Sequence, residues 1–455
     1  MRQVLFLLVL CVACWTPASE SAAAGPLNFV IIIADDMAWN DAGAYGHPHI
    51  RTPNIDRLAR EGMRFDRAFL TTSSCSPSRS SILTGRYPHA TGAGELHQHL
   101  PASQILVTKP LRDAGYYTAA AGKWHLGDAV RDRFDRIYGG RPSGCENWVQ
   151  ALADRPKNAP FFLWLAATDP HRPYRADTIS EPHTPDDVVI PPFLPDNAET
   201  RADFAMYYDE VARMDSYIGA VLDELDRQDI ADSTCVIFLS DNGRPFPRCK
   251  TTLYDTGIRT PFIVRYPGLT PRGASTMSLV STVDLAPTVL ELAKVKPLST
   301  FQGMSFAAIL ADPARRVRER IFAEHNWHDF PARERAVRGD RYLYIRNEYA
   351  DLAATPPSDI IRSETYRSML KALEEGTLPE EHAASFIAPR AKEELYDTTN
   401  DPYTMHNVID SPDLADLLGE LRAELDAWTT ATEDDAPPVR RRDEFDRVLG
   451  TRLPE

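Results

Sequence analysis

One short stretch of the chain combines a nucleophile with an anion-binding arrangement. It is Cys75-Ser76-Pro77-Ser78-Arg79. Because proline is tolerated in the first turn of a helix, Pro77 indicates a helix that begins near Cys75. Residues four apart share a helix face, which brings Arg79 beside Cys75, and the N–H groups and dipole of a helix N-terminus favour anions. The stretch therefore predicts a nucleophile at an anion site, with Cys75 expected as an exposed side chain of a cleft.

Two other interpretations of Cys75 stay open on these residues alone. The cysteine could act as a thiolate nucleophile of the phosphatase type, activated by its position at the helix N-terminus. It could also be a buried cysteine with only a structural role.

Acids, amides, a lysine and histidines follow four apolar runs along the chain. The runs cover residues 28–34, 117–121, 161–166 and 235–239. Continuous apolar runs of this length are typical of strands covered on both faces. The residues that follow them are Asp35-Asp36, Gly122-Lys123-Trp124-His125, Asp169-Pro170-His171-Arg172 and Ser240-Asp241-Asn242-Gly243. One such end alone is more often a turn or a helix cap. Four together predict one site, because open α/β sheets bind ligands at the carboxyl ends of their strands.

Helical patterns between these runs predict the fold class. Residues 207–225 carry apolar side chains every three or four positions, as in an amphipathic helix. Strands that alternate with helices predict an α/β fold with a large, mostly parallel sheet flanked by helices.

A smaller C-terminal α+β subdomain is expected from residue 335. Strands are predicted at residues 336–338 and 342–345, a polar helical insert at 358–390, and an amphipathic helix at 414–428. The charged tail after residue 438 is expected to be loosely ordered. The predicted division is a signal peptide at residues 1–24, a catalytic domain at 25–334, and this subdomain at 335–455.

Charge and the N-terminal segment indicate an exported enzyme. The 455 residues carry a formal net charge of -15, which does not fit a nucleic-acid binder and means that an anionic substrate needs a local cationic pocket. Arg2, the apolar residues 4–12 and the small residues up to Ala24 are typical of a signal peptide. That run is too short for a membrane-spanning helix, and no other segment resembles one.

Cysteine usage and glycosylation sites add to this expectation. Cys75, Cys145, Cys235 and Cys249 remain after signal cleavage, and their pairing cannot be deduced from the sequence. The chain has no Asn-x-Ser/Thr sequon, which favours a bacterial enzyme, periplasmic or secreted, over a lysosomal one.

The stretch at Cys75 resembles the type I sulfatase signature Cys-x-Pro-x-Arg, and Leu83-Thr84-Gly85 matches its continuation. The resemblance extends from Asp35-Asp36 to residues 394–397. It implies an alkaline-phosphatase-like fold with a large mixed sheet, and hydrolysis of sulfate esters. It also implies a maturation enzyme that oxidises Cys75 to formylglycine.

The resemblance further implies a role for each matching residue. Calcium ligands would be Asp35, Asp36, Asp241, Asn242 and the formylglycine made from Cys75, an all-oxygen set that suits a hard cation. The catalytic residues would be Cys75, Arg79, Lys123, His125, His171 and Lys250. No lysine is expected against the metal-binding carboxylates.

Substrate choice is less tightly indicated. Residues 74–79, 96–98 and 240–247 are most similar to the sulfamidases (heparan N-sulfatases, or N-sulfoglucosamine sulfohydrolases), whereas Lys250 and residues 254–259 follow sulfatases in general. We therefore expect a sulfated saccharide, with an O-sulfate ester ahead of an N-sulfamate. The candidates for the sugar pocket are Glu95, His97, His99, Arg172, Arg244, His325 and His328.

Two further hypotheses come from different classes. A phosphate or phosphonate monoester hydrolase of the same superfamily would share the metal and the nucleophile position. A catalytically inactive glycan-binding module is disfavoured, because every expected catalytic position is filled.

Overall fold

An eight-stranded sheet forms the centre of the larger of two units. The computed structural model describes residues 25–454, so the signal peptide expected at residues 1–24 lies outside the described residues. The strand order is β5-β4-β6-β1-β7-β8-β2-β9. The strands are β1 (Asn28–Ala34), β2 (Met63–Phe65), β4 (Tyr117–Gly122), β5 (Arg136–Tyr138), β6 (Phe161–Ala166), β7 (Thr234–Ser240), β8 (Phe262–Arg265) and β9 (Ala274–Thr276). Only β8 runs antiparallel to its neighbours, which confirms the predicted α/β fold with a mixed, mostly parallel sheet.

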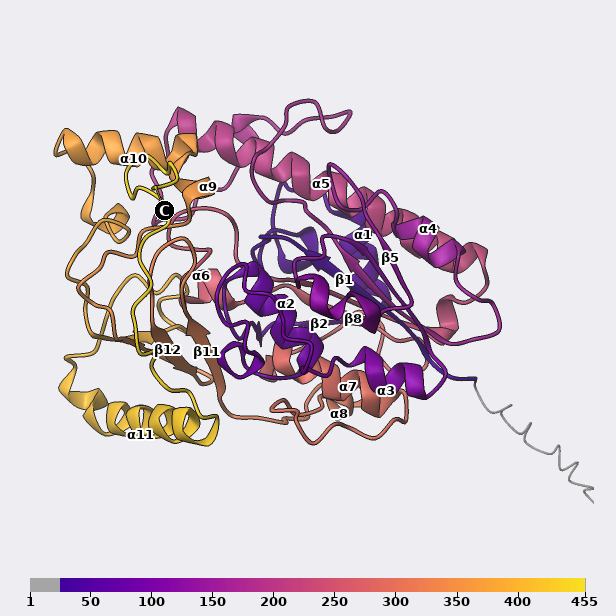
Figure 1. The fold of residues 1–455 in the computed structure, drawn as a ribbon. Helices are drawn as coiled ribbons and strands as arrows, with labels where there is room; N and C mark the ends of the chain where they lie inside the picture. Colours follow the sequence, from indigo (N-terminus) through magenta and orange to yellow (C-terminus); the bar gives the residue numbers. More distant parts are fainter. Residues whose placement is uncertain (1–24, 455) are drawn as a thin grey trace, which may run out of the picture.

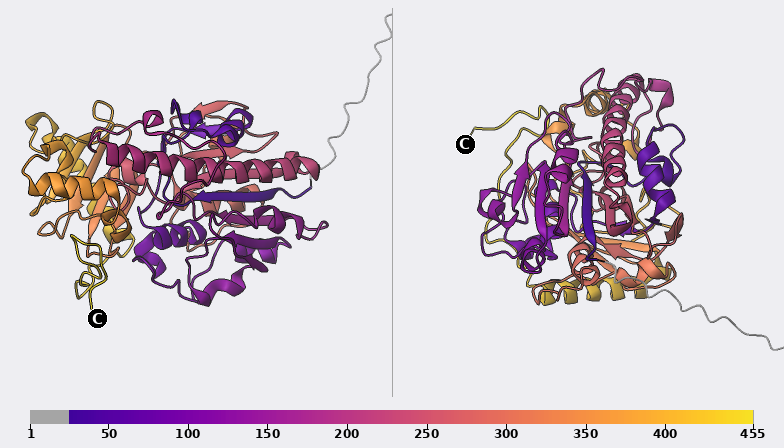
Figure 2. Two further views of the ribbon diagram at one scale, coloured as in Figure 1. Left: turned by 90° about the horizontal axis from the view of Figure 1, so that it is seen from above. Right: turned by 90° about the vertical axis from the view of Figure 1, so that its right-hand side faces the viewer.

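Helices cover both faces of this sheet (Figures 1 and 2). Because side chains alternate along a strand, Val30 and Ile32 of β1 face one layer, whereas Phe29 and Ile31 face the other. The first layer contains α1 (Pro53–Glu61), α4 (Trp148–Ala153) and the long helix α5 (Ala198–Arg227). The second contains α2 (Cys75–Thr84), α3 (Thr108–Asp113), α7 (Leu285–Leu292) and α8 (Ala307–Ala311). All four runs predicted as strands are therefore buried on both faces.

The smaller unit is built on a four-stranded antiparallel sheet. Its strands, in spatial order, are β11 (Ile321–His325), β12 (Glu334–Arg338), β13 (Tyr342–Asn347) and β14 (Glu393–Asp397). One face packs against Phe69 and Ile258 of the larger unit, and the other is covered by α11 (Ala415–Ala431). Because β11 pairs with β12, the expected boundary at residue 335 falls inside the second sheet.

The remaining segments complete the smaller unit and its contact with the larger one. The polar insert holds α9 (Ser358–Ile361) and α10 (Glu364–Glu374), and Met369 of α10 joins the core beneath α5. Short elements elsewhere are α6 (Asp255–Ile258) and the paired strands β3 (Ala68–Phe69) and β10 (Val280–Ser281).

The C-terminal tail differs from expectation, because it is held by polar contacts rather than loosely ordered. Arg440 forms a two-pronged ion pair with Asp351, and Trp327 Nε1 donates to the carbonyl of Arg442 at 3.0 Å. The charged residues that suggested disorder are thus the ones that attach the tail.

All four cysteines in the described part of the chain are free thiols. Among the described helices, none has the length and apolar character needed to cross a bilayer.

Candidate active site

The four predicted strand ends meet at one edge of the central sheet. Strands β4, β6, β1 and β7 are neighbours and run parallel, so the residues after them lie side by side. Backbone bonds fix this arrangement: Asp35 N donates to the carbonyl of Asp169 at 2.9 Å, and Asp241 N donates to that of Ala34 at 3.1 Å.

The nucleophile candidate stands at the first residue of α2, as the Pro77 pattern predicted. Cys75 is only 2% exposed, so the expectation of an exposed cleft side chain is wrong; every residue of α2 is buried. Its Sγ lies 3.1 Å from Asn242 Nδ2. Burial raises the pKa of the thiol far above its usual value. A protonated thiol is a poor nucleophile, which argues against the phosphatase-type thiolate.

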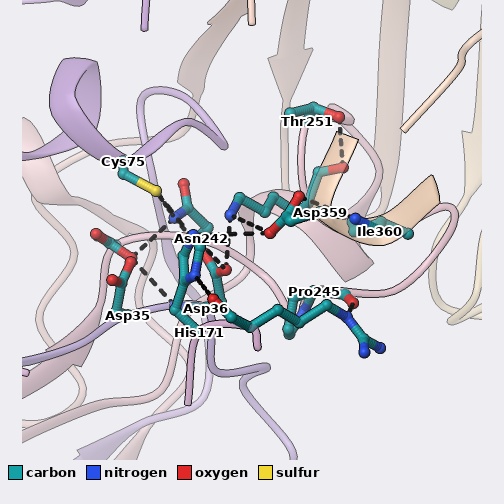
Figure 3. Close-up of polar contacts among 12 residues, drawn as sticks. Asp35, Asp36, Cys75, His171, Asn242, Pro245, Thr251, Asp359 and Ile360 are labelled. Carbon is teal, nitrogen blue, oxygen red and sulfur yellow. Dashed lines mark hydrogen bonds and ion pairs between the residues drawn. The ribbon is translucent and has the colours of Figure 1, made fainter. Parts of the chain in front are cut away.

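Three fully buried carboxylates and one amide surround Cys75, and Figure 3 shows two of the carboxylates, Asp35 and Asp36, with Asn242. The carboxylates are Asp35, Asp36 and Asp241. Asn242 Nδ2 donates to Asp36 Oδ1 at 2.8 Å and to Asp241 Oδ1 at 2.9 Å. One ligand atom each from Asp35, Cys75 and Asp241 lies within 4.8 Å of the other two, so the side chains converge on a common point.

Each carboxylate has a cationic partner. Arg79 Nε donates to Asp241 Oδ2 at 2.7 Å, and Lys250 Nζ donates to Asp36 Oδ2 at 2.7 Å. Lys123 Nζ donates to Asp35 Oδ2. The expectation that no lysine lies against these carboxylates is therefore wrong. Sequence spacing could not reveal these ion pairs, since Lys123 follows β4 and Lys250 lies in the loop between β7 and α6, far from both aspartates in sequence.

The buried charges shift the acidities in opposite directions. Burial raises the pKa of Asp241 to about 7, despite the lowering effect of Arg79. Burial also acts to raise the pKa of Asp35, but the neighbouring cations, Lys123 first among them, outweigh it and hold that pKa well below its usual range. The two carboxylates therefore bind protons very differently although they share one site.

The donor set of this cluster fits a hard divalent cation. Among the described residues, Asp35 Oδ1 and Asn242 Oδ1 are buried without a hydrogen-bond donor. Buried polar atoms are rarely left without partners, and carboxylate and amide oxygens are the ligands that calcium prefers. The predicted calcium ligands are thus together in space, with two oxygens available for coordination.

Two histidines form a pair at the mouth of the site. His97 Nδ1 lies 2.8 Å from His125 Nε2. Burial, reinforced by Lys123 and Arg79, lowers the pKa of His125 well below its usual value. Burial likewise lowers the pKa of His97. The lowered pKa values favour the neutral form of both rings, and a neutral imidazole can accept a proton.

A third histidine lies beside a carboxylate that sequence reasoning missed. His171 Nε2 is 3.6 Å from Asp359 Oδ2, and Lys250 Nζ is 3.4 Å from the same oxygen (Figure 3). Asp359 comes from α9 in the smaller unit. The sequence around it carries only a helix start after Pro357, and nothing there indicates that this segment reaches the larger unit's strand ends.

A large cavity of about 1340 Å³ opens beside these residues. The predicted site residues that line it are Lys123, His125, His171, His97 and Arg172. Its rim also holds the exposed arginines Arg131, Arg141 and Arg175. The acidic chain thus has the local cationic pocket that an anionic substrate needs.

The structure separates the other sugar-pocket candidates. Arg172 donates hydrogen bonds to Asp203, from Nη1 to Oδ1 at 2.7 Å and from Nη2 to Oδ2 at 2.8 Å. Arg244 Nη2 donates to Asp41 Oδ1 at 2.6 Å and does not line the cavity. His325 is buried at the end of β11, also away from the cavity. Of His97, Arg172, Arg244 and His325, only His97 lines the cavity without a carboxylate partner.

The chain belongs to the sulfatase family. The protein-family model described as Sulfatase matches residues 27–295. A second family model, described as N-sulphoglucosamine sulphohydrolase, C-terminal, matches residues 248–354. The protein is accordingly an enzyme that hydrolyses sulfate esters, and the resemblance seen at Cys75 is confirmed at the level of the family.

Individual relatives cover nearly the whole chain. An ulvan-active sulfatase from Formosa agariphila is 30% identical over 94% of this chain and 80% of its own length. Human N-sulphoglucosamine sulphohydrolase is 31% identical over 90% of this chain and 91% of its own length. The solved structure of BT4656 in complex with its substrate D-glucosamine-2-N,6-O-disulfate has a TM-score of 0.68 at 20% identity, covering 90% of this chain and 99% of that one. The phosphonate monoester hydrolase of Agrobacterium radiobacter has a TM-score of 0.68 at 18% identity, covering 89% and 96%. Likenesses at this identity show the shared fold.

Proposed function

We propose that the protein removes sulfate from a sulfated saccharide, through a formylglycine made from Cys75 and with calcium bound beside it. The observation that carries the proposal is the placement of Cys75 at a helix N-terminus, inside a ring of three carboxylates and three cations. The raised pKa of the cysteine thiol supports modification, since the thiol itself is poorly suited to attack.

Asp35, Asp36, Asp241 and Asn242 would hold the calcium ion, together with the oxygen of residue 75. As formylglycine, residue 75 would supply an oxygen nucleophile once its aldehyde is hydrated, and the ion held by these residues would supply positive charge beside that oxygen. Asp241 is suited to accept a proton there, because burial raises its pKa to about 7.

The three cations of the ring bind and orient the sulfate. Arg79 is fully buried and also donates through Nη1 to the carbonyl of Lys123 at 3.2 Å, so its guanidinium is fixed in place. Lys123 lines the cavity, whereas Lys250 is buried against Asp36. Preorganised positive groups of this kind stabilise charge on the sulfuryl oxygens during transfer, which is the largest expected contribution to the rate.

Two histidines handle protons on opposite sides of the sulfate. Burial lowers the pKa of His125 and favours its neutral form, which can take the proton of the second hydroxyl at residue 75 when sulfate leaves. His171 Nδ1 donates to the carbonyl of Arg172, which leaves Nε2 as the nitrogen that delivers a proton to the departing sugar atom.

The bond cleaved is proposed to be an O-sulfate ester. Lys250 and residues 254–259 follow sulfatases in general, and the ulvan-active relative supports a polysaccharide substrate. Cleavage of an N-sulfamate is the second candidate, favoured by the match of residues 248–354 to the C-terminal model of N-sulphoglucosamine sulphohydrolase. The phosphate and phosphonate alternative has only a structural likeness at 18% identity behind it.

A paired assay tests the proposal. Matured protein is given glucosamine N-sulfate and O-sulfated mono- and disaccharides of matched size, with phosphate monoesters as a third arm. We expect sulfate release from an O-sulfated sugar. Release only from glucosamine N-sulfate would establish the sulfamidase alternative, and faster turnover of the phosphate monoesters would overturn the proposal.

Maturation and export belong to the same proposal. A formylglycine-generating enzyme would convert Cys75, and the mature protein would act in the periplasm or outside the cell. Mass analysis of the peptide that contains residue 75, and N-terminal sequencing of the exported protein, test these two points separately. An unmodified thiol in fully active protein would contradict the first, and an N-terminus at Met1 would contradict the second.

A further inference from the structure

The carboxylate of Asp359 reaches the active site from the smaller unit (Figure 3). Its Oδ2 lies 3.4 Å from Lys250 Nζ and 3.6 Å from His171 Nε2. The side chain is 16% exposed, so it borders the site without being open to bulk water. The proposed function assigns it no part.

Packing and hydrogen bonds hold this carboxylate in place. The neighbouring Ile360 and Ile361 are fully buried. Ser358 N donates to Asp329 Oδ2 at 2.9 Å, and Ile360 N donates to Asp359 Oδ1 at 3.0 Å. A side chain set on so constrained a segment can orient another group, because it loses little freedom when it does so.

The hydrogen bonds of His171 define which ring nitrogen faces Asp359. A carbonyl oxygen can only accept, so the contact with the carbonyl of Arg172 places a proton on Nδ1. The second ring proton, when present, is on Nε2, which faces Asp359 at 3.6 Å and Asp36 at 3.8 Å. Asp36 is committed to calcium in the proposed site. Asp359 is then the carboxylate left to hold the Nε2 proton.

We propose that Asp359 is a positioning residue that holds His171 Nε2 on the leaving-group side of the sulfate. This inference rests on the proposed function. In the step concerned, sulfur bonds to the oxygen of residue 75 while its bond to the sugar oxygen breaks. The electron pair stays on the sugar oxygen, and that oxygen takes the proton from His171 Nε2. Asp359 itself gains and loses no atom.

The inference predicts a dependence on the leaving group. A sugar alkoxide needs a proton as the S–O bond breaks, whereas 4-nitrophenolate leaves without one. Positioned proton donors contribute about 10²–10⁴-fold in rate, so misplacing one in Asp359→Asn should lower kcat on a sugar sulfate about 10–100-fold. On 4-nitrophenyl sulfate kcat should fall less than about threefold, because the proton is not needed there. KM should change little on either substrate.

Matched variants separate positioning from a general loss of structure. Glu364→Gln removes a carboxylate from the next helix that is 62% exposed and should leave both activities unchanged. Melting temperatures of both variants check that the fold is intact. On the sugar sulfate alone, Asp359→Asn should add no further loss in a His171→Ala background, because the two residues act as one unit.

Equal losses of kcat on both substrates, or additive losses in the double variant, would overturn the inference. So would a raised KM with unchanged kcat, since that result marks a direct substrate contact. These outcomes leave the proposed function intact. If matured wild-type protein releases sulfate from neither substrate, the proposed function itself fails and the inference falls with it.

Discussion

Removing calcium from the proposed site should weaken the fold only modestly, because the structure balances its buried charges without the metal. Asp35, Asp36 and Asp241 face Lys123, Lys250 and Arg79 one to one. A ligand at 100 times its dissociation constant stabilises by about 2.7 kcal/mol. At about 2 °C per kcal/mol for a large domain, chelation should lower Tm by roughly 5 °C. Activity should be lost, and calcium should restore both quantities.

A variant that removes one balancing cation provides the sharper test. Lys250 is 1% exposed and donates to Asp36 at 2.7 Å. Lys250→Met leaves a buried carboxylate without its cation, which costs about 3–5 kcal/mol in the metal-free protein. Calcium supplies the missing positive charge, so the Tm difference between calcium-loaded and chelated protein should exceed that of wild type.

The assay is calorimetry of both proteins with calcium or with excess chelator, so the result does not depend on turnover. Lys109→Met is the matched control, since the side chain of Lys109 is 53% exposed and pairs with an exposed Asp113. It should show the wild-type difference. An equal Tm difference in Lys250→Met and wild type would refute the charge-balance reasoning. Unfolding of the wild-type protein on chelation at 25 °C would also refute this reasoning, because it would show that the cations do not balance the carboxylates.

Three further predictions follow from single contacts. Cys75→Ala should abolish turnover while changing the free energy of unfolding by only about 1 kcal/mol; circular dichroism, chemical denaturation and sulfate release measure these quantities, and full activity would end the formylglycine proposal. His89 Nδ1 contacts Glu324 Oε2; burial alone would lower the pKa of His89, but the carboxylate more than offsets this and raises that pKa above 6.5. The pair should therefore stabilise the fold fully below pH 6.5 and progressively less as pH rises through the raised pKa. A Tm–pH profile that keeps this slope in His89→Gln would contradict the assignment. Gly122→Ala should destabilise the fold by several kcal/mol, because φ is +95° and the new Cβ would lie 2.0 Å from a carbonyl oxygen of β6. Gly115→Ala, with φ +89° but open space around the new Cβ, should cost only about 1–2 kcal/mol. Urea denaturation compares the two variants, and equal losses would show that only the backbone strain matters.

The main sheet, and the meeting of Asp35, Asp36 and Asp241 at one of its edges, could be predicted from the sequence, because local patterns determine both. The apolar run that became β1 could be buried only between helix layers, and its end had to place Asp35 and Asp36 at the carboxyl edge. The position of α2 followed from Pro77. These features depend on neighbours in sequence, or on the common direction of parallel strands.

Features that depend on how the two units dock could not be predicted. Asp359 reaches the site through packing of a segment more than one hundred residues beyond Lys250. Arg172 and Arg244 were plausible sugar ligands until the structure paired them with Asp203 and Asp41. An arginine after a strand looks the same in sequence whether or not a distant carboxylate neutralises it.

The burial of Cys75 also has a consequence for the timing of biosynthesis. The residue before its helix contacts the smaller unit, because His328 Nδ1 lies 2.8 Å from Ser74 Oγ, 254 residues further along the chain. If residue 75 is matured by another enzyme, that enzyme must reach it before His328 docks against Ser74. At about 5–20 residues per second, synthesis of that intervening segment takes roughly 10–50 s. Faster folding of the first unit, or slower arrival of the modifying enzyme, would leave a fraction of molecules correctly folded yet permanently inactive.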